Sequence, residues 1–376
     1  MEFKIQKKDF LKGLERTLTV VERRNTMPSL NHALFELKDN TLQISATDLE
    51  IFVSSTVNCK SLTTGRVAIP ARSVFDIVKE CSDSGDIHVR TGDSNRIEIL
   101  SGKSSFKLLG LSSDSFPHFK ASPKGQLTQG KLKVKDFTRL LHKTEHAVAT
   151  DEIRYFLTGI YLETAEENGK SLIRTVSTDG SRLAMCEVDQ KEIGQFQLKK
   201  GLIIPRKGVA ELRRLLESTL EDTFEITADE NLMRVNTGDF HLWIRPIDGE
   251  YPPYQRLVAL SLPSMCEINR KELLTSLRRM ALLVSDRSKV VTFEFKKDKI
   301  VLSTVNPDVG EANDEVSCNY NGPEFKTGYN VRFCIDALSH LDSDEVQMSL
   351  GEKLQPAILR SSENPGYLIV IMPMRI

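Results

Sequence analysis

The order of secondary-structure signals repeats three times along the chain, and this repetition limits the possible folds more than any other feature. In each unit of about 125 residues, a helical pattern is followed by alternating strand patterns, a second helix and more strands. The first helices are expected to begin near Asp9, Asp136 and Asn269, three residue types that favour N-cap positions. We therefore predict three similar α+β domains, each an antiparallel sheet with two helices on one face, at 1–125, 126–258 and 259–376. The segments near 122–130 and 257–264 are expected to be linkers.

A Thr-Asp pair recurs between strand patterns within these units. The segment 171–184 alternates as strand, turn and strand around Thr178-Asp179-Gly180, and Thr47-Asp48 stands in the same context. Asp can accept hydrogen bonds from the backbone of a turn, and Gly tolerates a positive φ. Asp48 and Asp179 could instead be metal ligands or acid–base carboxylates, but turn stabilisation is the interpretation that their context favours.

The composition excludes several classes of protein. The formal net charge is −1, so the chain has no general basic character, and its six cysteines include no CxxC pair. That cysteine usage argues against a zinc ribbon or a disulfide framework and is typical of the reducing cytoplasm, where we expect this protein to act. The N-terminus lacks the apolar region of a signal peptide, and no apolar run is long enough to span a membrane.

Motifs for catalysis or cofactor binding are missing. Two Gly-Lys-Ser segments match the end of a phosphate-binding loop, but Ile97 and Thr164 stand where that loop needs its first glycine. His142 and His146 have the i, i+4 spacing of metal ligands, yet the sequence supplies no third ligand nearby, and an exposed helix face is the favoured interpretation. We expect no catalytic residue, no bound metal and no cofactor.

The predicted helices concentrate positive charge. Together the six carry 20 basic and 13 acidic residues, about +7, so the rest of the chain carries about −8. If the helices share one face, that face is suited to phosphates, although solvated amphipathic helices would show the same bias. Six helices packed ~9 Å apart enclose a hole narrower than ~10 Å, whereas twelve leave about 24 Å, wide enough for a duplex of ~20 Å. A ring around DNA would therefore need two copies of the chain.

Several segments in a fixed order give the chain a family resemblance. RYFLTG at 154–159, TVSTDGSRLA at 175–184, IPRKGVAEL at 204–212, DGEYPPYQR at 248–256 and the terminal MPMRI resemble the bacterial sliding clamps, the beta subunits of DNA polymerase III. The resemblance extends over the whole length. It implies a non-catalytic processivity factor: a head-to-tail homodimeric ring with helices inside and sheets outside, which encircles duplex DNA without reading its sequence. The implied partners are the polymerase alpha subunit, the clamp loader and other proteins with a clamp-binding peptide, and no membrane.

The resemblance also implies three sets of site residues. A pocket for partner peptides is expected at Arg154, Leu157, Thr178, Gly180, Arg182, Leu183, Pro252, Arg256, Val370, Ile371, Met372, Pro373, Met374 and Arg375, with three of its arginines as polar anchors at the rim. A last core strand is the alternative for the terminal stretch, above all for Ile369 and Ile371, because alternate residues of a strand face opposite ways. DNA contacts are expected at Arg24, Lys79, Arg139, Tyr155, Phe156, Arg206, Lys207 and Arg279. The dimer interface is expected to join Phe106 and Leu108 to Leu282 and Leu283, although ordinary core packing is a strong alternative for the last two.

Two other classes of function remain open at this stage. A nucleotide-dependent enzyme acting on DNA would need a metal-binding or phosphate-binding set that the sequence does not contain. A peptide-binding scaffold that never touches DNA would not depend on basic residues such as Arg24, Arg206 and Lys207.

Overall fold

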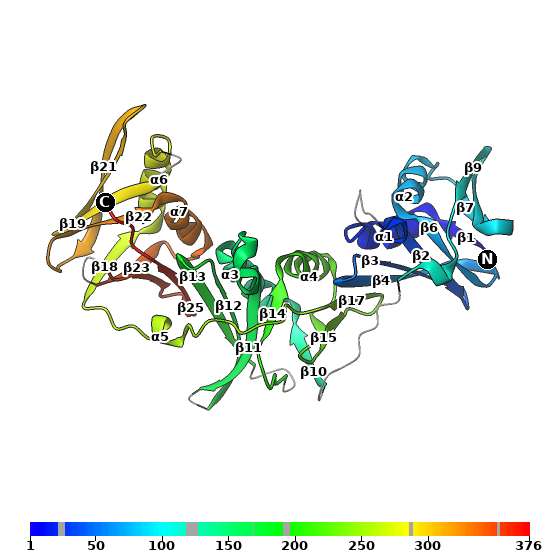
Figure 1. The fold of residues 1–376 in the computed structure, drawn as a ribbon, viewed down its shortest axis with the longest axis horizontal. Coiled ribbons are helices and arrows are strands. Elements are labelled where there is room, and N and C mark those ends of the chain that lie inside the picture. The colour runs from blue at the N-terminus through cyan, green and yellow to red at the C-terminus, as the bar shows by residue number, and fades with distance from the viewer. Residues whose placement is uncertain (22–26, 118–126, 168, 191–195, 286–288, 352–353) are drawn as a thin grey trace. The chain divides into compact units, whose positions relative to one another are not determined.

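The computed structural model describes all residues except 22–26, 118–126, 168, 191–195, 286–288 and 352–353. It contains two compact units, which we describe separately (Figure 1). The first consists of Met1–Lys135, Glu192–Lys200 and Lys207–Pro246, and the second of Asp136–Lys191, Gly201–Arg206 and Ile247–Ile376.

The first unit is built on two antiparallel sheets. The smaller has the order β5 (Lys60–Thr63), β1 (Glu2–Gln6), β7 (Asp86–Thr91), β8 (Arg96–Ser101), β9 (Ser104–Leu109). The larger has the order β10 (Thr128–Lys133), β15 (Thr223–Ala228), β16 (Met233–Asn236), β17 (Phe240–Ile244), β4 (Ile51–Asn58), β3 (Thr41–Thr47), β2 (His32–Lys38), β6 (Gly65–Pro70). Its helices are α1 (Lys7–Leu18), α2 (Ala71–Glu80) and, apart from its first residue, α4 (Arg206–Ser218). Helices α1 and α2 lie side by side, and each buries one apolar stripe (Figure 1).

The second unit contains one twelve-stranded antiparallel sheet. Its order is β14 (Leu202–Pro205), β11 (Gly159–Glu167), β12 (Lys170–Thr178), β13 (Arg182–Asp189), β25 (Asn364–Ile371), β24 (Ala357–Ser361), β23 (Glu345–Leu350), β18 (Ser264–Asn269), β21 (Gly310–Tyr320), β20 (Lys299–Asn306), β19 (Val290–Lys296), β22 (Phe325–Asn330). The helices are most of α3 (Val134–Thr144), α5 (Gln255–Val258), α6 (Arg270–Ala281) and α7 (Val331–His340). Short 3-10 turns follow α3 at Glu145–Ala147 (η4) and Glu152–Leu157 (η5). Helices α6 and α7 pack side by side (Figure 1).

The predicted helix starts are correct for one helix and displaced for two. Asn269 caps α6, because its side-chain oxygen accepts from the backbone N–H groups of Lys271 (3.1 Å) and Glu272 (3.2 Å). Asp9 and Asp136, by contrast, lie inside the first turns of α1 and α3, so their assignment as caps is wrong. An acidic residue in a first turn is favoured by the helix dipole instead of by a capping hydrogen bond.

The repeated Thr-Asp turns have the same hydrogen bonds in both units. The Oγ1 of Thr47 donates to the carbonyl of Ile51 (2.7 Å), and that of Thr178 donates to the carbonyl of Arg182 (2.6 Å). In each turn the aspartate Oδ1 accepts from the two backbone N–H groups that lie two and three residues further on. The turn-stabilising role predicted for both aspartates is therefore confirmed.

The central third of the chain contributes strands to both large sheets, which the repeat pattern alone did not reveal. Strands β15–β17 continue the sheet of the first unit through the pairing of β17 with β4. Strands β11–β13 continue the sheet of the second unit through the pairing of β13 with β25. The expected linker at 122–130 is wrong for its last three residues, which belong to β10, and 122–126 lie outside the described residues. The expected linker at 257–264 includes the end of α5 and the start of β18, and the predicted domain limits remain predictions.

Candidate functional site

An apolar cluster covers one face of the large sheet in the second unit, at the position of the predicted peptide pocket. Residues from β12, β13, β24 and β25 form its buried part together with one tyrosine that precedes α5: Val176, Leu183, Met185, Ile358, Leu368, Val370 and Tyr254. Partly buried side chains pack against it, namely Tyr161, Tyr251, Leu257, Val258 and Leu262. Because several of these side chains keep exposed surface, this apolar cluster can receive apolar groups of a partner.

The strand register separates the predicted pocket residues into two faces. Leu183 pairs with Val370 across β13 and β25, and both belong to the apolar cluster. Ile371 follows Val370, and successive strand residues point to opposite faces, so its buried side chain lies on the other side of the sheet. The structure thus contradicts the placement of Ile371 in the pocket wall.

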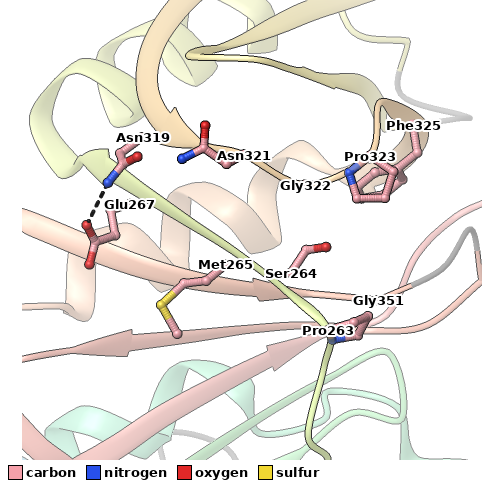
Figure 2. Close-up of a pocket in the computed structure, with 10 residues that line it drawn as sticks. All are labelled: Pro263, Ser264, Met265, Glu267, Asn319, Asn321, Gly322, Pro323, Phe325 and Gly351. Atoms are coloured by element: carbon pink, nitrogen blue, oxygen red, sulfur yellow. Dashed lines mark hydrogen bonds between the residues drawn. The ribbon is translucent and has the colours of Figure 1, made fainter.

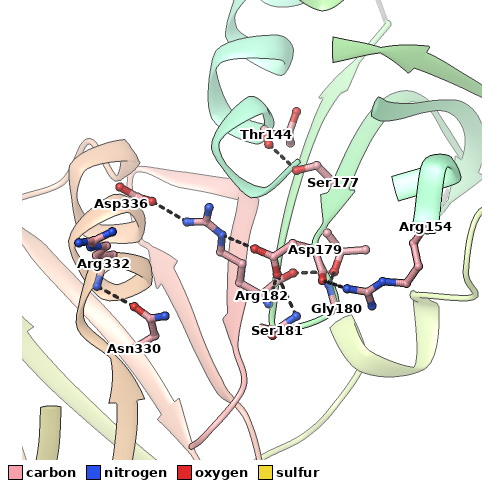
Figure 3. A network of polar contacts seen from close by, with 11 residues as sticks. Thr144, Arg154, Ser177, Asp179, Gly180, Ser181, Arg182, Asn330, Arg332 and Asp336 are labelled. Carbon is pink, nitrogen blue, oxygen red and sulfur yellow. Dashed lines mark hydrogen bonds and ion pairs between the residues drawn. The ribbon is translucent and has the colours of Figure 1, made fainter. Parts of the chain in front are cut away.

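The Thr178–Arg182 turn is held from one side by Arg154, as Figure 3 shows. The Nη2 of Arg154 donates to the backbone oxygen of Asp179 over 2.8 Å. Gly180 has a φ of +87°, and a Cβ built there would lie 2.5 Å from the Nη1 of Arg154. Glycine adopts this backbone conformation without strain, and its lack of a Cβ leaves room for the close approach of the guanidinium group.

Arg182 does not extend to the rim of the apolar cluster, where the sequence analysis expected a polar anchor. It precedes Leu183 in β13, and its guanidinium group points toward α7 (Figure 3). There it pairs with Asp179 (3.0 Å) and Asp336 (2.6 Å) and lies 4.3 Å from the ring centre of Phe333. Arg182 therefore connects the turn to α7 through its two ion pairs. The prediction that this arginine is a polar anchor at the rim of the pocket is wrong.

The C-terminal residues are fixed to the sheet by backbone hydrogen bonds. The N–H of Met372 donates to the carbonyl of Ser181 (2.9 Å), and the N–H of Met374 donates to that of Gly328 (2.8 Å). The side chain of Met372 is 37% exposed, Pro373 and Met374 are half-buried, and Arg375 is exposed. The other predicted pocket members differ in access, because Thr178 and Pro252 are half-buried, Arg256 is exposed and Leu157 is buried.

Most of the predicted DNA-contacting residues are accessible, but several have partners within the protein. Lys207 pairs with Asp48, Arg279 pairs with Asp314, and Arg139 donates to the side chain of Asn364. Lys79 and Arg206 are exposed, and no side-chain partner for either is present in the described part of the chain. Tyr155 is exposed and packs edge-on against half-buried Phe156, whereas Arg24 lies outside the described residues.

The two predicted halves of the dimer interface are both apolar and accessible. Phe106 and Leu108 are half-buried on β9, which is the last strand of its sheet and has a partner on one side only. Leu282 follows α6 and is 82% exposed, and Leu283 is half-buried. The alternative that Leu282 and Leu283 are ordinary core residues is therefore wrong for Leu282.

A third histidine, His340, lies beside the pair His142 and His146 that stands out in the sequence. The ring of His340 on α7 stacks on His146 with 4.2 Å between centroids, and it lies 5.2 Å from the ring of His142. Burial, and then the nearby His340 and Arg182, lower the pKa of His146 to about 2, so this imidazole is neutral. Within the described ranges no group of His, Cys, Asp or Glu side chains is suited to hold a metal ion.

A separate hollow of about 800 Å³ opens beside β18 and the loop between β21 and β22 (Figure 2). Pro263, Met265, Pro323 and Phe325 line it, and Glu267 on its border accepts a hydrogen bond from Asn319 (3.2 Å). None of the predicted site residues belongs to its lining. No helix in the described parts of the chain is long and apolar enough to cross a membrane.

The repeated α+β units define the class of protein as a multi-domain α+β protein with antiparallel sheets, and one of its sheets carries an accessible apolar cluster. Three family models cover the chain in order: the N-terminal domain of the DNA polymerase III beta subunit at residues 1–120, its central domain at 131–253 and its C-terminal domain at 262–375. The beta sliding clamp of Caulobacter vibrioides is 30% identical over 377 residues, and that of Haemophilus influenzae is 32% identical over 380, each with full coverage of both chains. The crystal structure of the DNA polymerase sliding clamp from Caulobacter crescentus is 29% identical, with a TM-score of 0.94 over both whole chains.

The chain belongs to the bacterial beta sliding clamps, the beta subunits of DNA polymerase III. It is a three-domain α+β clamp protein with antiparallel sheets, and it acts as a non-catalytic processivity subunit in DNA replication. The predicted family, fold class and function are thereby confirmed. Tyr161, Tyr251 and Tyr254 also belong to the site, and no motif in the sequence indicated them as site residues.

Proposed function

We propose that two copies of this chain close a head-to-tail ring around duplex DNA and hold the replicative polymerase on it. The observation that carries this proposal is the presence of two different accessible apolar surfaces, one along β9 and one at the end of α6. Different surfaces that bind each other form a heterologous contact, which closes into a ring when the rotation allows it. Such pairing would also cover the free edge of β9.

Sequence-independent DNA binding would come from basic side chains on the helices. Arg206 and Lys79 are exposed, so their charges are accessible to phosphates, whereas Arg279 and Lys207 already face carboxylates. Contacts of this kind position a protein on DNA without selecting a sequence. The loose fit of a ring would allow sliding. The site of action that we propose is the cytoplasm.

Topological retention tests this function. The protein, loaded onto nicked circular DNA by its clamp loader, should stay bound in high salt and should leave when the circle is cut. A ring held by topology is insensitive to counterions, whereas phosphate contacts alone weaken steeply with salt. Equal loss from circular and linear DNA in high salt would refute the ring.

We infer further that the apolar cluster binds short peptides of the polymerase alpha subunit, the clamp loader and other clamp-motif proteins. Leu183 and Val370 would form its floor, and the exposed thioether of Met372 would adapt to different apolar side chains. Arg256 and Arg375 are exposed and would contact polar groups of the peptide.

A charge placed at the edge of the cluster tests the peptide site. Met372→Glu should weaken binding of a labelled hexapeptide ending in Leu-Phe by at least about tenfold, because a buried carboxylate without a partner is costly. Met265→Glu is a matched control, since Met265 is 51% exposed on β18 and lies outside the cluster. Fluorescence anisotropy measures both. Equal affinities of the two variants would contradict the assignment.

A further inference from the structure

The segment 247–262, which we call the α5 segment, contains Pro252 and Arg256 and lies against the apolar cluster. Two tyrosines fix it there. The ring of Tyr251 stacks on Tyr161 of β11, with 4.7 Å between centroids and 6° between ring planes. Tyr254 is 4% exposed and is the only member of the buried cluster that the α5 segment supplies.

Beneath Tyr254 lies a buried arginine with three carboxylate partners. The side chain of Arg174 is only 8% exposed, and it pairs with Glu167 and Glu187 at 2.7 Å and with Glu163 at 3.3 Å. Its Nη1 also donates to the hydroxyl of Tyr254 over 3.4 Å, and that hydroxyl donates to Oε1 of Glu163. The hydroxyl of Tyr254 thus both accepts and donates a hydrogen bond, as buried polar groups require.

The hydrogen bonds of Tyr254 are specific for one position of the α5 segment. Burial raises the pKa of its phenol, so the hydroxyl keeps its proton and donates to Glu163. Glu163 and Arg174 are fixed by their places on β11 and β12, which pair through residues 163 and 174. Moving Tyr254 away would leave the half-buried carboxylate of Glu163 and the buried guanidinium of Arg174 with fewer partners, and this has a free-energy cost.

Helix α5 is too short to be stable without contacts to the rest of the protein. It contains four residues, a single turn, and isolated turns of that length are unstable because nucleation is unfavourable. Tyr254 is the residue immediately before it, Arg256 is on it, and Leu257 packs against the cluster. Two further hydrogen bonds hold the α5 segment: the N–H of Ile247 donates to the carbonyl of Ile203 (2.8 Å), and Nη2 of Arg360 donates to the carbonyl of Val258 (3.3 Å).

We propose that Tyr254, held by Glu163 and Arg174, is a positioning residue that fixes α5 as a preformed wall of the peptide site. This inference rests on the peptide binding proposed above. Because this wall is already ordered in the free protein, peptide binding loses less conformational entropy. Tyr254 acts by placing Arg256 and its neighbours, because its own side chain is almost completely buried.

A double-mutant cycle tests the inference with the labelled hexapeptide ending in Leu-Phe and the full-length chain. Tyr254→Phe keeps the ring and removes the hydroxyl, and we expect about tenfold weaker binding. In an Arg256→Ala background the same change should weaken binding by about twofold or less, because the contact it positions is gone. Glu163→Gln keeps an acceptor for the phenol and should retain affinity within about threefold, whereas Glu163→Leu should match Tyr254→Phe.

Tyr320→Phe is the matched control. Tyr320 is fully buried, and its hydroxyl donates to the carbonyl of Pro323 over 2.7 Å, so this change removes the same atom without touching the α5 segment. It should lower the melting temperature as Tyr254→Phe does but leave peptide affinity unchanged. If Tyr254→Phe weakens peptide binding equally in the parent and Arg256→Ala backgrounds, or in neither, the positioning role of Tyr254 is wrong while the peptide site itself stands. Failure of the parent protein to bind the peptide would reject the peptide site and the inference together.

Discussion

The neutral, buried His146 should make the stability of the second unit depend on pH. Its two ring nitrogens are buried and have no hydrogen-bond partner among the described residues. Its pKa is about 2 in the folded protein, compared with an ordinary value of 6.5, because of burial first and then the charges of His340, Arg182, His142 and Lys143. The unfolded chain therefore binds a proton below pH 6.5 that the folded chain does not bind.

The sign and size of the effect follow from proton linkage. Stability is complete above pH 6.5 and falls as the pH decreases below that value, down to about pH 2. At pH 5, protonation of this one imidazole in the unfolded state costs about 2 kcal/mol. For a unit of this size, that loss corresponds to a fall in melting temperature of about 4–8 °C.

Replacing the imidazole by a ring that cannot titrate isolates its contribution. His146→Phe should reduce the difference in melting temperature between pH 8 and pH 5 by about 4–8 °C in scanning calorimetry. Leu354→Phe is the control, because Leu354 is exposed and carries no titratable group, so its replacement should leave that difference unchanged. If His146→Phe and the parent protein show the same pH dependence, the buried neutral imidazole is not the cause.

Two more predictions concern the proposed ring. Arg206→Ala should weaken binding to short duplex DNA and reduce the slope of log affinity against log salt by about one, because its exposed charge is accessible to phosphate. Arg279→Ala should leave that slope unchanged, since its guanidinium is held by a carboxylate, and equal slopes in the two variants would contradict this distinction. Leu282→Asp should convert the proposed dimer to monomers at micromolar concentration in analytical ultracentrifugation, because it would put a charge in the proposed apolar contact. Leu220→Asp, at another fully exposed leucine, should leave the mass unchanged, and a stable Leu282→Asp dimer would refute the proposed interface.

The sequence predicted those elements whose signal is local. Alternating apolar residues located β19 and β20, and helical spacing located all six of the longer helices. Strand β21 was missed because its segment GEANDEVSCNY is mostly polar, and only its pairing with β18 and β20 makes it a strand. Helix α5 was missed as well, since one turn has no period to detect.

Of the buried apolar cluster, Leu183 and Val370 were named from the sequence, but the direction in which neighbouring side chains point was not predictable. Leu183 and Val370 lie on one face because the register of β13 with β25 places them opposite each other, and that register is a long-range property. The same register turns Arg182 toward α7, where Asp336 and Phe333 hold it. No local pattern in the sequence contains this information, because α7 lies some 150 residues further along the chain.

The two Thr-Asp turns have the same hydrogen bonds but differ at their third residue, which is Leu49 in one turn and Gly180 in the other. The third residue of each turn has a left-handed backbone, with φ +80° at Leu49 and +87° at Gly180, so the turn needs the conformation but not glycine itself. Leu49 bears the cost of that conformation, about 1–2 kcal/mol, on an exposed side chain. At Gly180 a leucine would also collide with Arg154, which lies against the turn and donates to the carbonyl of Asp179. Glycine at 180 is therefore explained by the close approach of Arg154 to this turn. The turn leads directly into Leu183 of the apolar cluster.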